Sequence, residues 1–179
     1  MWNLQEDRPT ILVTGGSQGA VSINAALADA VERLTGAGYQ ILHAYGRKND
    51  APAAHDHYTA VPYIDDMEAA YAVADVVVCR SGAMTVAENS AAGIPAIYIP
   101  LPHGNGEQGL NSAHLVDAGA ALRIDDAALS GDVLVDKLLP LKEPAARATM
   151  RAALEDSGAG SVAEDLAARI AAAAGKDTK

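Results

Sequence analysis

The chain has 179 residues, of which 50% are hydrophobic and 20% are charged, and this composition indicates a folded globular domain and excludes a disordered segment. The formal net charge of −10 argues against nucleic acid and against an anionic membrane surface as direct partners, because clustered Lys and Arg side chains bind both. The single cysteine, Cys79, excludes an intrachain disulfide. This single cysteine and the polar, acidic residues 1–7, which do not resemble a signal peptide, together predict a cytoplasmic protein.

Short β-rich runs alternate with alanine-rich helical stretches along the chain. We expect strands at residues 10–14, 39–45, 60–63, 76–79, 96–99 and 120–124. We expect helices at residues 23–34, 67–74, 84–92, 109–118, 130–139, 144–155 and 161–174. Strands that are apolar on both faces and separated by helices are typical of a parallel sheet covered on both sides. The sequence therefore predicts the α/β class, with a Rossmann-like doubly wound sheet and no internal domain boundary.

We expect one folded domain between two short terminal segments. This domain spans residues 10–160, and the polar residues 1–9 before it are predicted to be a linker. Residues 161–174 are predicted to form a separate terminal helix, and residues 175–179 a disordered tail.

The first candidate binding segment is a glycine-rich turn directly after the first expected strand, Thr14-Gly-Gly-Ser-Gln-Gly-Ala20. Its glycines, Gly16 among them, allow the backbone to approach a phosphate or sugar closely, and Ser17 adds a hydroxyl donor. The alternative is a tight turn without a ligand. The segment matches neither a dinucleotide fingerprint nor a P-loop. The strand at residues 39–45 also ends without the acid that would hold the ribose of NAD.

The second candidate segment follows the strand at residues 76–79, where a turn leads into a helix. The backbone N–H groups of Ala83, Met84 and Thr85 would lie at the start of this helix and could bind a diphosphate. Glu88, one turn later, could accept hydrogen bonds from a ribose diol. The spacing of Thr85 and Glu88 equally fits a capping box, in which Glu88 would bond to the backbone. The spacing alone leaves both interpretations open.

The third candidate segment is a polar loop at residues 100–111, rich in glycine and proline, after the fifth expected strand. Glu107, Gln108 and Asn111 could bond to sugar hydroxyls there. The alternative is an exposed loop in which Glu107 and Gln108 only start a helix. We expect no metal site, because the pair His55 and His57 has no third ligand in sight.

Four stretches together resemble the carboxyl-terminal half of the proteins of the MurG family, which are GT-B glycosyltransferases. They are Thr14-Gly-Gly-Ser-Gln-Gly-Ala20, Tyr63-Ile-Asp-Asp-Met67, Asp75-Val-Val-Val-Cys-Arg-Ser-Gly-Ala-Met-Thr-Val-Ala-Glu88 and Ala92-Gly-Ile-Pro-Ala96. The third stretch is the most specific of the four. Members of this family transfer N-acetylglucosamine from UDP to the undecaprenyl-linked muramyl-pentapeptide lipid I and so form lipid II of peptidoglycan.

The resemblance implies a donor site for UDP-N-acetylglucosamine that uses residues of each segment. The turn of Gly16 and Ser17 would contact the donor phosphate or sugar, and the backbone of Ile64 would read the uracil edge. The resemblance further implies that the diphosphate binds at Ala83, Met84 and Thr85 and that the ribose hydroxyls bind at Glu88. The N-acetylglucosamine hydroxyls would bind at Glu107 and Gln108. The family often has two adjacent glutamines at the last two positions, so the role of Glu107 differs from the family pattern.

The resemblance also implies an inverting, metal-independent reaction without a cofactor that needs a second, amino-terminal half. That half would hold lipid I, the catalytic base and the membrane-facing patch, so we expect no catalytic residue here and an isolated chain that is inactive. The helix at residues 161–174 would pack toward it, and the whole enzyme would lie at the cytoplasmic face of the plasma membrane. The alternatives are half of a split N-acetylglucosaminyltransferase, half of a UDP-N-acetylglucosamine epimerase with Glu107 as its acid or base, and a non-enzymatic binding module.

Overall fold

The computed structural model of the chain describes residues 1–102 and 106–158. These residues form a six-stranded sheet in the order β3-β2-β1-β4-β5-β6, and each adjacent pair of strands is parallel. The strands are β1 (Thr10–Thr14), β2 (Gln40–Ala44), β3 (Tyr58–Val61), β4 (Val76–Cys79), β5 (Ala96–Tyr98) and β6 (Ala121–Arg123). This strand order is that of a doubly wound dinucleotide-type sheet, so the predicted fold class is confirmed.

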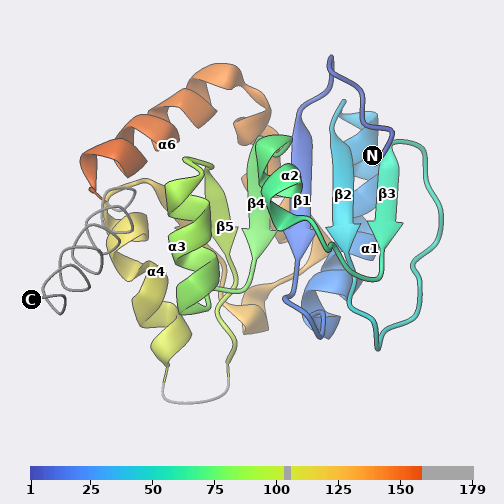
Figure 1. Ribbon diagram of the computed structural model, residues 1–179, viewed down its shortest axis with the longest axis horizontal. Coiled ribbons are helices and arrows are strands. Elements are labelled where there is room, and N and C mark those ends of the chain that lie inside the picture. The colour runs from blue at the N-terminus through green and yellow to red at the C-terminus, as the bar shows by residue number, and fades with distance from the viewer. Residues whose placement is uncertain (103–105, 159–179) are drawn as a thin grey trace, which may run out of the picture.

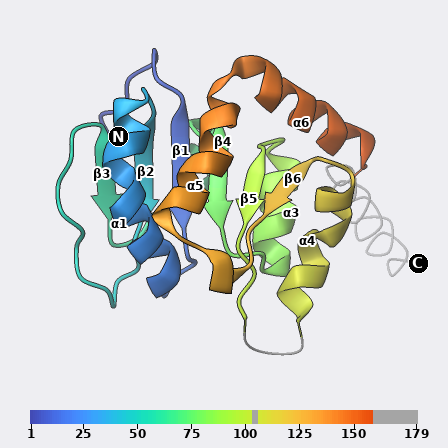
Figure 2. The same cartoon turned by 180° about the vertical axis from the view of Figure 1, so that it is seen from behind.

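Helices cover both faces of the sheet. They are α1 (Val21–Gly36), α2 (Met67–Ala72), α3 (Ala83–Ala91), α4 (Glu107–Asp117), α5 (Gly131–Leu138) and α6 (Pro144–Asp156), with the 3-10 turns η1 (Asp126–Ala128) and η2 (Leu139–Lys142). Figure 2 shows α1 and α5 together on one face, whereas α2, α3 and α4 lie on the face toward the viewer in Figure 1. None of the helices in the described ranges is both long enough and apolar enough to cross a bilayer.

The core consists of two apolar layers, one on each side of the sheet. Ile11 and Val13 of β1 point into the layer under α1 and α5, and Leu12 between them points into the layer under α2, α3 and α4. All three side chains are almost completely buried. The inner positions of such strands are apolar because both faces of the sheet are covered, and this explains why they read as continuous apolar runs in the sequence.

Most observed boundaries differ from the expected ones by one or two residues, as β3 and α4 illustrate. β3 begins at Tyr58 and ends at Val61, not at residue 63, because Pro62 follows it and has no N–H for the ladder. α4 begins at Glu107, two residues before the expected start, and Gly106 precedes it in the left-handed conformation with a φ of 74°. The helix expected at residues 161–174 and the tail at residues 175–179 lie outside the described residues.

Residues 1–9 run along the amino edge of the sheet and contact it. The backbone N–H of Gln5 donates to Gln40 Oε1 at 2.7 Å, and Gln40 Nε2 donates back to the carbonyl of Gln5 at 2.7 Å. Trp2 packs against the apolar layer that α2 covers. The role of residues 1–9 as a linker stays a prediction.

A polar network centred on the buried His43 of β2 connects this strand to α1 and β3. Asn24 of α1 donates through Nδ2 to the carbonyl of Tyr45 at 2.9 Å, so its Oδ1 is the acceptor for His43 Nε2 at 3.0 Å. His43 Nδ1 then accepts from the hydroxyl of Tyr58 at 2.7 Å. Burial lowers the pKa of His43 to about 4, so this imidazole is neutral at neutral pH.

Candidate functional site

The strand register brings the carboxyl ends of the central strands to one level. Thr14 at the end of β1 is paired with Ala44 at the end of β2 and with Cys79 at the end of β4. The chain continues from β1 into α1 on one face and from β4 into α3 on the other face. The order of the strands reverses at this point, and ligands of open α/β sheets bind in the crevice that results.

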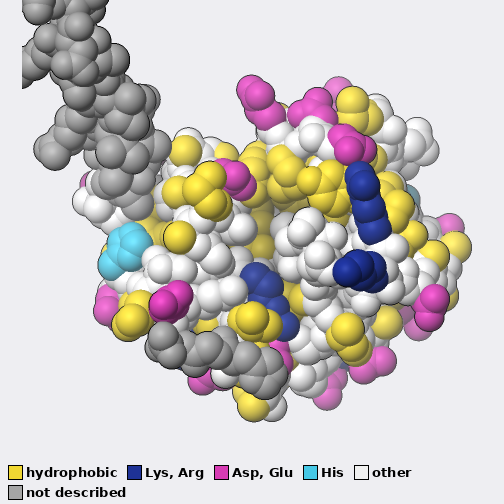
Figure 3. Space-filling view, turned by 60° about the horizontal axis from the view of Figure 1, so that its bottom comes forward, with side chains coloured by type: hydrophobic (Ala, Val, Ile, Leu, Met, Phe, Trp, Pro, Cys, Tyr) yellow, Lys and Arg dark blue, Asp and Glu magenta, His cyan; other side chains and the backbone are white. Residues whose placement is uncertain are grey.

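A cavity of about 610 Å³ opens at this crevice. Its walls come from the ends of β1, β2 and β4, the segment between β3 and α2, the first turns of α3 and α4, and the loop after β5. The lining residues are Thr14, Gly15, Gly16, Ser17, Gln18, Gly19, Ala20, Val21, Ala44, Tyr63, Ile64, Met67, Tyr71, Cys79, Arg80, Gly82, Thr85, Glu88, Leu101 and Gln108. Figure 3 turns this edge toward the viewer and shows a hollow bordered by apolar side chains, with basic side chains in and beside it.

The glycine-rich turn forms one wall of the cavity. A Cβ on Gly15 would collide with the backbone of Gly19 and Ala20, so a side chain at this position has no room. Gly16 has a φ of 81°, a conformation that glycine adopts without strain. Asn49 Nδ2 donates to the carbonyl of Gln18 in the turn at 3.0 Å and to the carbonyl of Tyr45 after β2 at 2.8 Å, so it links the turn to the end of β2. The exposed Ser17 lies on the cavity wall, and its contact with a donor stays a prediction.

The start of α3 forms the opposite wall. The N-cap residue Gly82 is extended and has no side-chain cap, and its carbonyl accepts from the N–H of Val86 at 3.0 Å. Helix geometry therefore leaves the N–H groups of Ala83, Met84 and Thr85 without a helical acceptor. Thr85 lines the cavity, whereas Ala83 and Met84 are not among its lining residues.

The capping-box interpretation of Thr85 and Glu88 is wrong. The residue that caps α3 is Gly82, three positions earlier, so Thr85 lies inside the first turn and Glu88 lies in the second. Glu88 is exposed on the cavity wall, and its Oε2 accepts a hydrogen bond from the hydroxyl of Tyr71 at 3.0 Å. Its carboxylate is therefore free from a capping role and faces the cavity with a partner from another helix.

The first turn of α4 is fixed to the turn before α3. Ser81 Oγ donates to the carbonyl of Gln108 at 2.7 Å, and Asn111 Nδ2 donates to the carbonyl of Ser81 at 3.0 Å. The side-chain oxygen of Gln108 accepts from the N–H of Leu101 at 3.0 Å, so Oε1 is engaged by the loop after β5. Asn111, considered above as a contact for sugar hydroxyls, does not line the cavity and instead connects α4 to the turn before α3.

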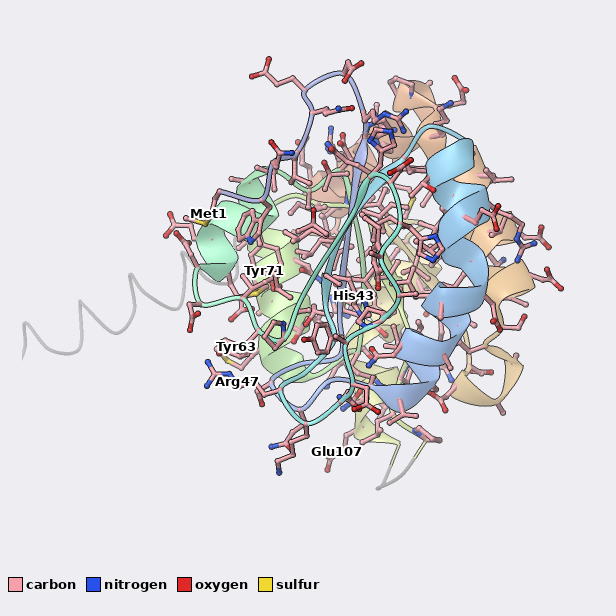
Figure 4. The ribbon with its side chains drawn as sticks, turned by 90° about the vertical axis from the view of Figure 1, so that its right-hand side faces the viewer. Met1, His43, Arg47, Tyr63, Tyr71 and Glu107 are labelled. Carbon is pink, nitrogen blue, oxygen red and sulfur yellow. The ribbon has the colours of Figure 1, made fainter. Side chains whose placement is uncertain are left out.

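Glu107 does not line the cavity. It begins α4 and is exposed, in agreement with the alternative that it starts a helix. In Figure 4 it lies well away from the labelled Tyr71 and Tyr63. Its contact with a donor sugar stays a prediction.

The segment between β3 and α2 closes the far end of the cavity. Ile64 lines the cavity, with its side chain buried, and Tyr63 and Met67 line it on either side. Arg47 lies over the ring of Tyr63, with its guanidinium carbon 4.4 Å from the ring centroid (Figure 4). Asp66 caps α2 by accepting from the N–H of Ala69 at 2.9 Å.

Arg80 is a cavity residue that the sequence reasoning missed. Its Nη1 forms an ion pair with Asp126 Oδ1 at 2.6 Å and donates to the carbonyl of Ile99 at 3.1 Å, and its Nη2 donates to Ser22 Oγ at 2.9 Å. The Arg80 side chain is only 14% exposed. It therefore joins the ends of β4 and β5 to α1 and η1 and fixes the floor of the cavity. Its position directly after the apolar run of β4 was the signal available in the sequence.

Cys79 supplies no nucleophile to the cavity. Cys79 is buried, and burial raises the pKa of its thiol to about 12, so it stays protonated. In residues 1–102 and 106–158, no group of three or more His, Cys, Asp or Glu side chains is arranged to hold a metal ion.

Six of the nine predicted donor-site residues line the same cavity. These are Gly16, Ser17, Ile64, Thr85, Glu88 and Gln108, which come from four separate parts of the chain. The lining residues that the prediction did not name as donor contacts include Tyr63, Met67, Tyr71, Arg80 and Leu101. Met67 and Tyr71 are four residues apart in α2, so their common helix face was the signal that could have found them.

Comparison with known proteins gives the family. Residues 10–170 match the glycosyltransferase family 28 C-terminal domain. The chain is 56% identical over 172 residues to the UDP-N-acetylglucosamine–N-acetylmuramyl-(pentapeptide) pyrophosphoryl-undecaprenol N-acetylglucosamine transferase of Corynebacterium glutamicum (strain R), with 96% of this chain and 48% of that protein covered. It is 54% identical over 159 residues to the Mycolicibacterium smegmatis protein of the same name, with 86% and 41% covered.

The solved structures agree with the sequence relatives. The crystal structure of Acinetobacter baumannii MurG superposes with a TM-score of 0.73 at 32% identity and covers 90% of this chain and 50% of that one. The chain thus spans about half the length of the curated relatives it matches. Its Rossmann-like fold is one half of a GT-B glycosyltransferase, and the chain belongs to the glycosyltransferase family 28 C-terminal domain family.

Proposed function

We propose that this chain is the donor half of an N-acetylglucosaminyltransferase that binds UDP-N-acetylglucosamine. The observation that carries the proposal is the cavity at the switch point of the sheet. It is lined by six of the predicted donor-site residues and lies beside the start of α3, where the N-cap residue Gly82 makes no side-chain hydrogen bond. With an amino-terminal acceptor half, it would transfer N-acetylglucosamine to lipid I and form lipid II for peptidoglycan. The name of the Corynebacterium glutamicum relative, which describes this transfer, supports the acceptor.

The cavity offers a different group to each part of the donor. The backbone amides of Ala83, Met84 and Thr85 would hold the diphosphate, because a helix N-terminus combines free donors with a favourable dipole. This mode of binding needs no basic patch and so fits a chain with a net charge of −10. Ile64 would read the uracil edge through its backbone, and Glu88 would accept hydrogen bonds from the ribose hydroxyls.

The sugar end of the donor would lie between the glycine-rich turn and α4. Gln108 would donate through Nε2 to a sugar oxygen, because its Oε1 is already bonded to Leu101. Ser17 and the backbone of Gly16 would contact the donor phosphate or sugar on the opposite side. Glu107 would reach the sugar only from outside the present cavity lining.

The chemistry that this half would support is an inverting displacement. The acceptor hydroxyl would attack the anomeric carbon while UDP leaves, and the base would come from the amino-terminal half. The amides of α3 would stabilise the charge that grows on the leaving diphosphate, so the reaction would need no metal ion. The isolated chain would then bind the donor without turnover, and the whole enzyme would work at the cytoplasmic face of the plasma membrane, where its lipid acceptor lies.

Titration calorimetry of the chain with UDP in the presence of EDTA tests the proposal. We expect saturable binding without Mg²⁺, competition by UDP-N-acetylglucosamine, and binding of UMP that is weaker by about tenfold because UMP lacks the second phosphate. ADP is the matched control for the base and should bind much more weakly than UDP. No heat with millimolar UDP, or equal affinity for UDP and ADP, would contradict the proposal.

A further inference from the structure

The Glu88 carboxylate has a hydrogen-bond partner from a different helix. The hydroxyl of Tyr71 on α2 donates to Glu88 Oε2 on α3 at 3.0 Å, and both residues line the cavity. Figure 4 shows Tyr71 on the side of the molecule formed by α2, near the cavity residue Tyr63. This contact spans 17 residues of sequence and joins the two helices at the cavity wall.

The Tyr71 hydroxyl is a fixed donor. The ring is partly buried and packs against the apolar layer beneath α2 and α3, so it is held in place from below. Burial, and after it the hydrogen bond and charge of Glu88, raise the pKa of the Tyr71 phenol above its ordinary value. The phenol therefore stays protonated near neutral pH and can only donate to the carboxylate.

An exposed glutamate side chain without such a partner samples many rotamers, and a ligand that needs one of them has to supply the cost of ordering it. The bond from Tyr71 engages Oε2 and leaves Oε1 and the second acceptor site of Oε2 for a vicinal diol. We propose that Tyr71 is a positioning residue that holds the Glu88 carboxylate ready for the 2′- and 3′-hydroxyls of the donor ribose. This inference rests on the proposed function and deepens it, since it makes Tyr71 a determinant of selectivity for ribose.

The test is the ratio of the dissociation constants for UDP and 2′-deoxy-UDP, measured by calorimetry on the wild-type chain and on Tyr71→Phe. Phenylalanine keeps the packed ring and removes only the donor. We expect the wild-type chain to prefer UDP, and Tyr71→Phe to weaken UDP binding about fivefold while the affinity for 2′-deoxy-UDP changes less than about twofold. The preference for ribose should therefore shrink.

Tyr58→Phe is the matched control. It also removes a phenol hydrogen bond, the one to His43, but Tyr58 lies outside the cavity lining. It should keep the wild-type ratio even where it lowers the melting temperature. Equal weakening of both ligands by Tyr71→Phe, or a wild-type ratio in that variant, overturns the positioning role.

The inference and the proposed function can fail separately. If Glu88→Ala removes the preference for ribose and Tyr71→Phe retains it, the proposed function holds and the inference is overturned. If the wild-type chain binds UDP and 2′-deoxy-UDP equally, the ribose contact in the proposed function is overturned, and the role of Tyr71 with it.

Discussion

Replacing Glu88 by Ala is expected to weaken UDP binding by about 10- to 100-fold, as expected for the loss of hydrogen bonds to a charged group. The thermal midpoint should move by less than about 2 °C, because the side chain is exposed and α3 is capped at Gly82. Calorimetry with UDP and a thermal melt of the same sample measure the two quantities together.

Glu68→Ala is the matched control for this variant. Glu68 is an exposed carboxylate on α2, close to the same region of the surface, but it does not line the cavity. The two variants remove the same charge, so a general electrostatic effect would appear in both. An unchanged UDP affinity in Glu88→Ala, combined with a lower thermal midpoint, would refute the ribose contact and return Glu88 to a purely structural role.

The stability of the chain is expected to fall between pH 6.5 and pH 4 because of His43. Its pKa is about 4 in the folded chain and 6.5 in its ordinary state, and burial of the imidazole is the cause. Above pH 6.5 the imidazole of His43 is neutral in both the folded and the unfolded chain, so it has no effect on stability. Below that pH the unfolded chain binds a proton that the folded chain does not, so unfolding is favoured. Relative to neutral pH, the free energy of unfolding is thereby lowered by about 2 kcal/mol at pH 5 and by about 3 kcal/mol below pH 4.

Urea unfolding at pH 7.5 and pH 5.0 checks this expectation through the variant His43→Gln. The variant starts from a lower stability because the contacts with Asn24 and Tyr58 change, but its loss between the two pH values should be about 2 kcal/mol smaller than that of the wild-type chain. His114→Gln changes an exposed histidine on α4 and should retain the wild-type loss. A wild-type pH dependence in His43→Gln would show that another group is responsible.

The fold was predictable because the local pattern and the burial agree in this chain. The run Val76–Cys79 is apolar at every position, and the structure buries all four residues in a central strand between two covered faces. Glycines mark the turns at Gly15 and Gly16 and at Gly93, where the chain changes from strand to helix or from helix to strand. The prediction that ligand-binding segments follow strand ends needed only the rule that parallel strands share one carboxyl edge.

The side-chain partners within the site could not be read from the sequence. Arg80 and its ion-pair partner Asp126 are 46 residues apart, and Tyr71 meets Glu88 only because α2 and α3 lie on the same face of the sheet. The orientation of Gln108 depends on the backbone of the loop after β5. Such contacts follow from the packing of elements distant in the sequence, which spacing does not reveal.

The ambiguity at Glu88 had a different origin. The spacing between Thr85 and Glu88 is the same in a capping box and in the body of a helix, so the assignment depends on where the helix begins. The helix begins at Ala83, because Ser81 is fixed to α4 and Gly82 is extended. The position of the helix start therefore excludes the capping box, and the ribose contact of Glu88 stays a prediction.

A crystal structure of the chain with bound UDP is the most direct test of the donor site. The account predicts diphosphate oxygens about 3 Å from the backbone nitrogens of Ala83, Met84 or Thr85, with the ribose hydroxyls at Glu88. A diphosphate bound away from the start of α3, or amides there that are covered by the chain's own side chains, would contradict it.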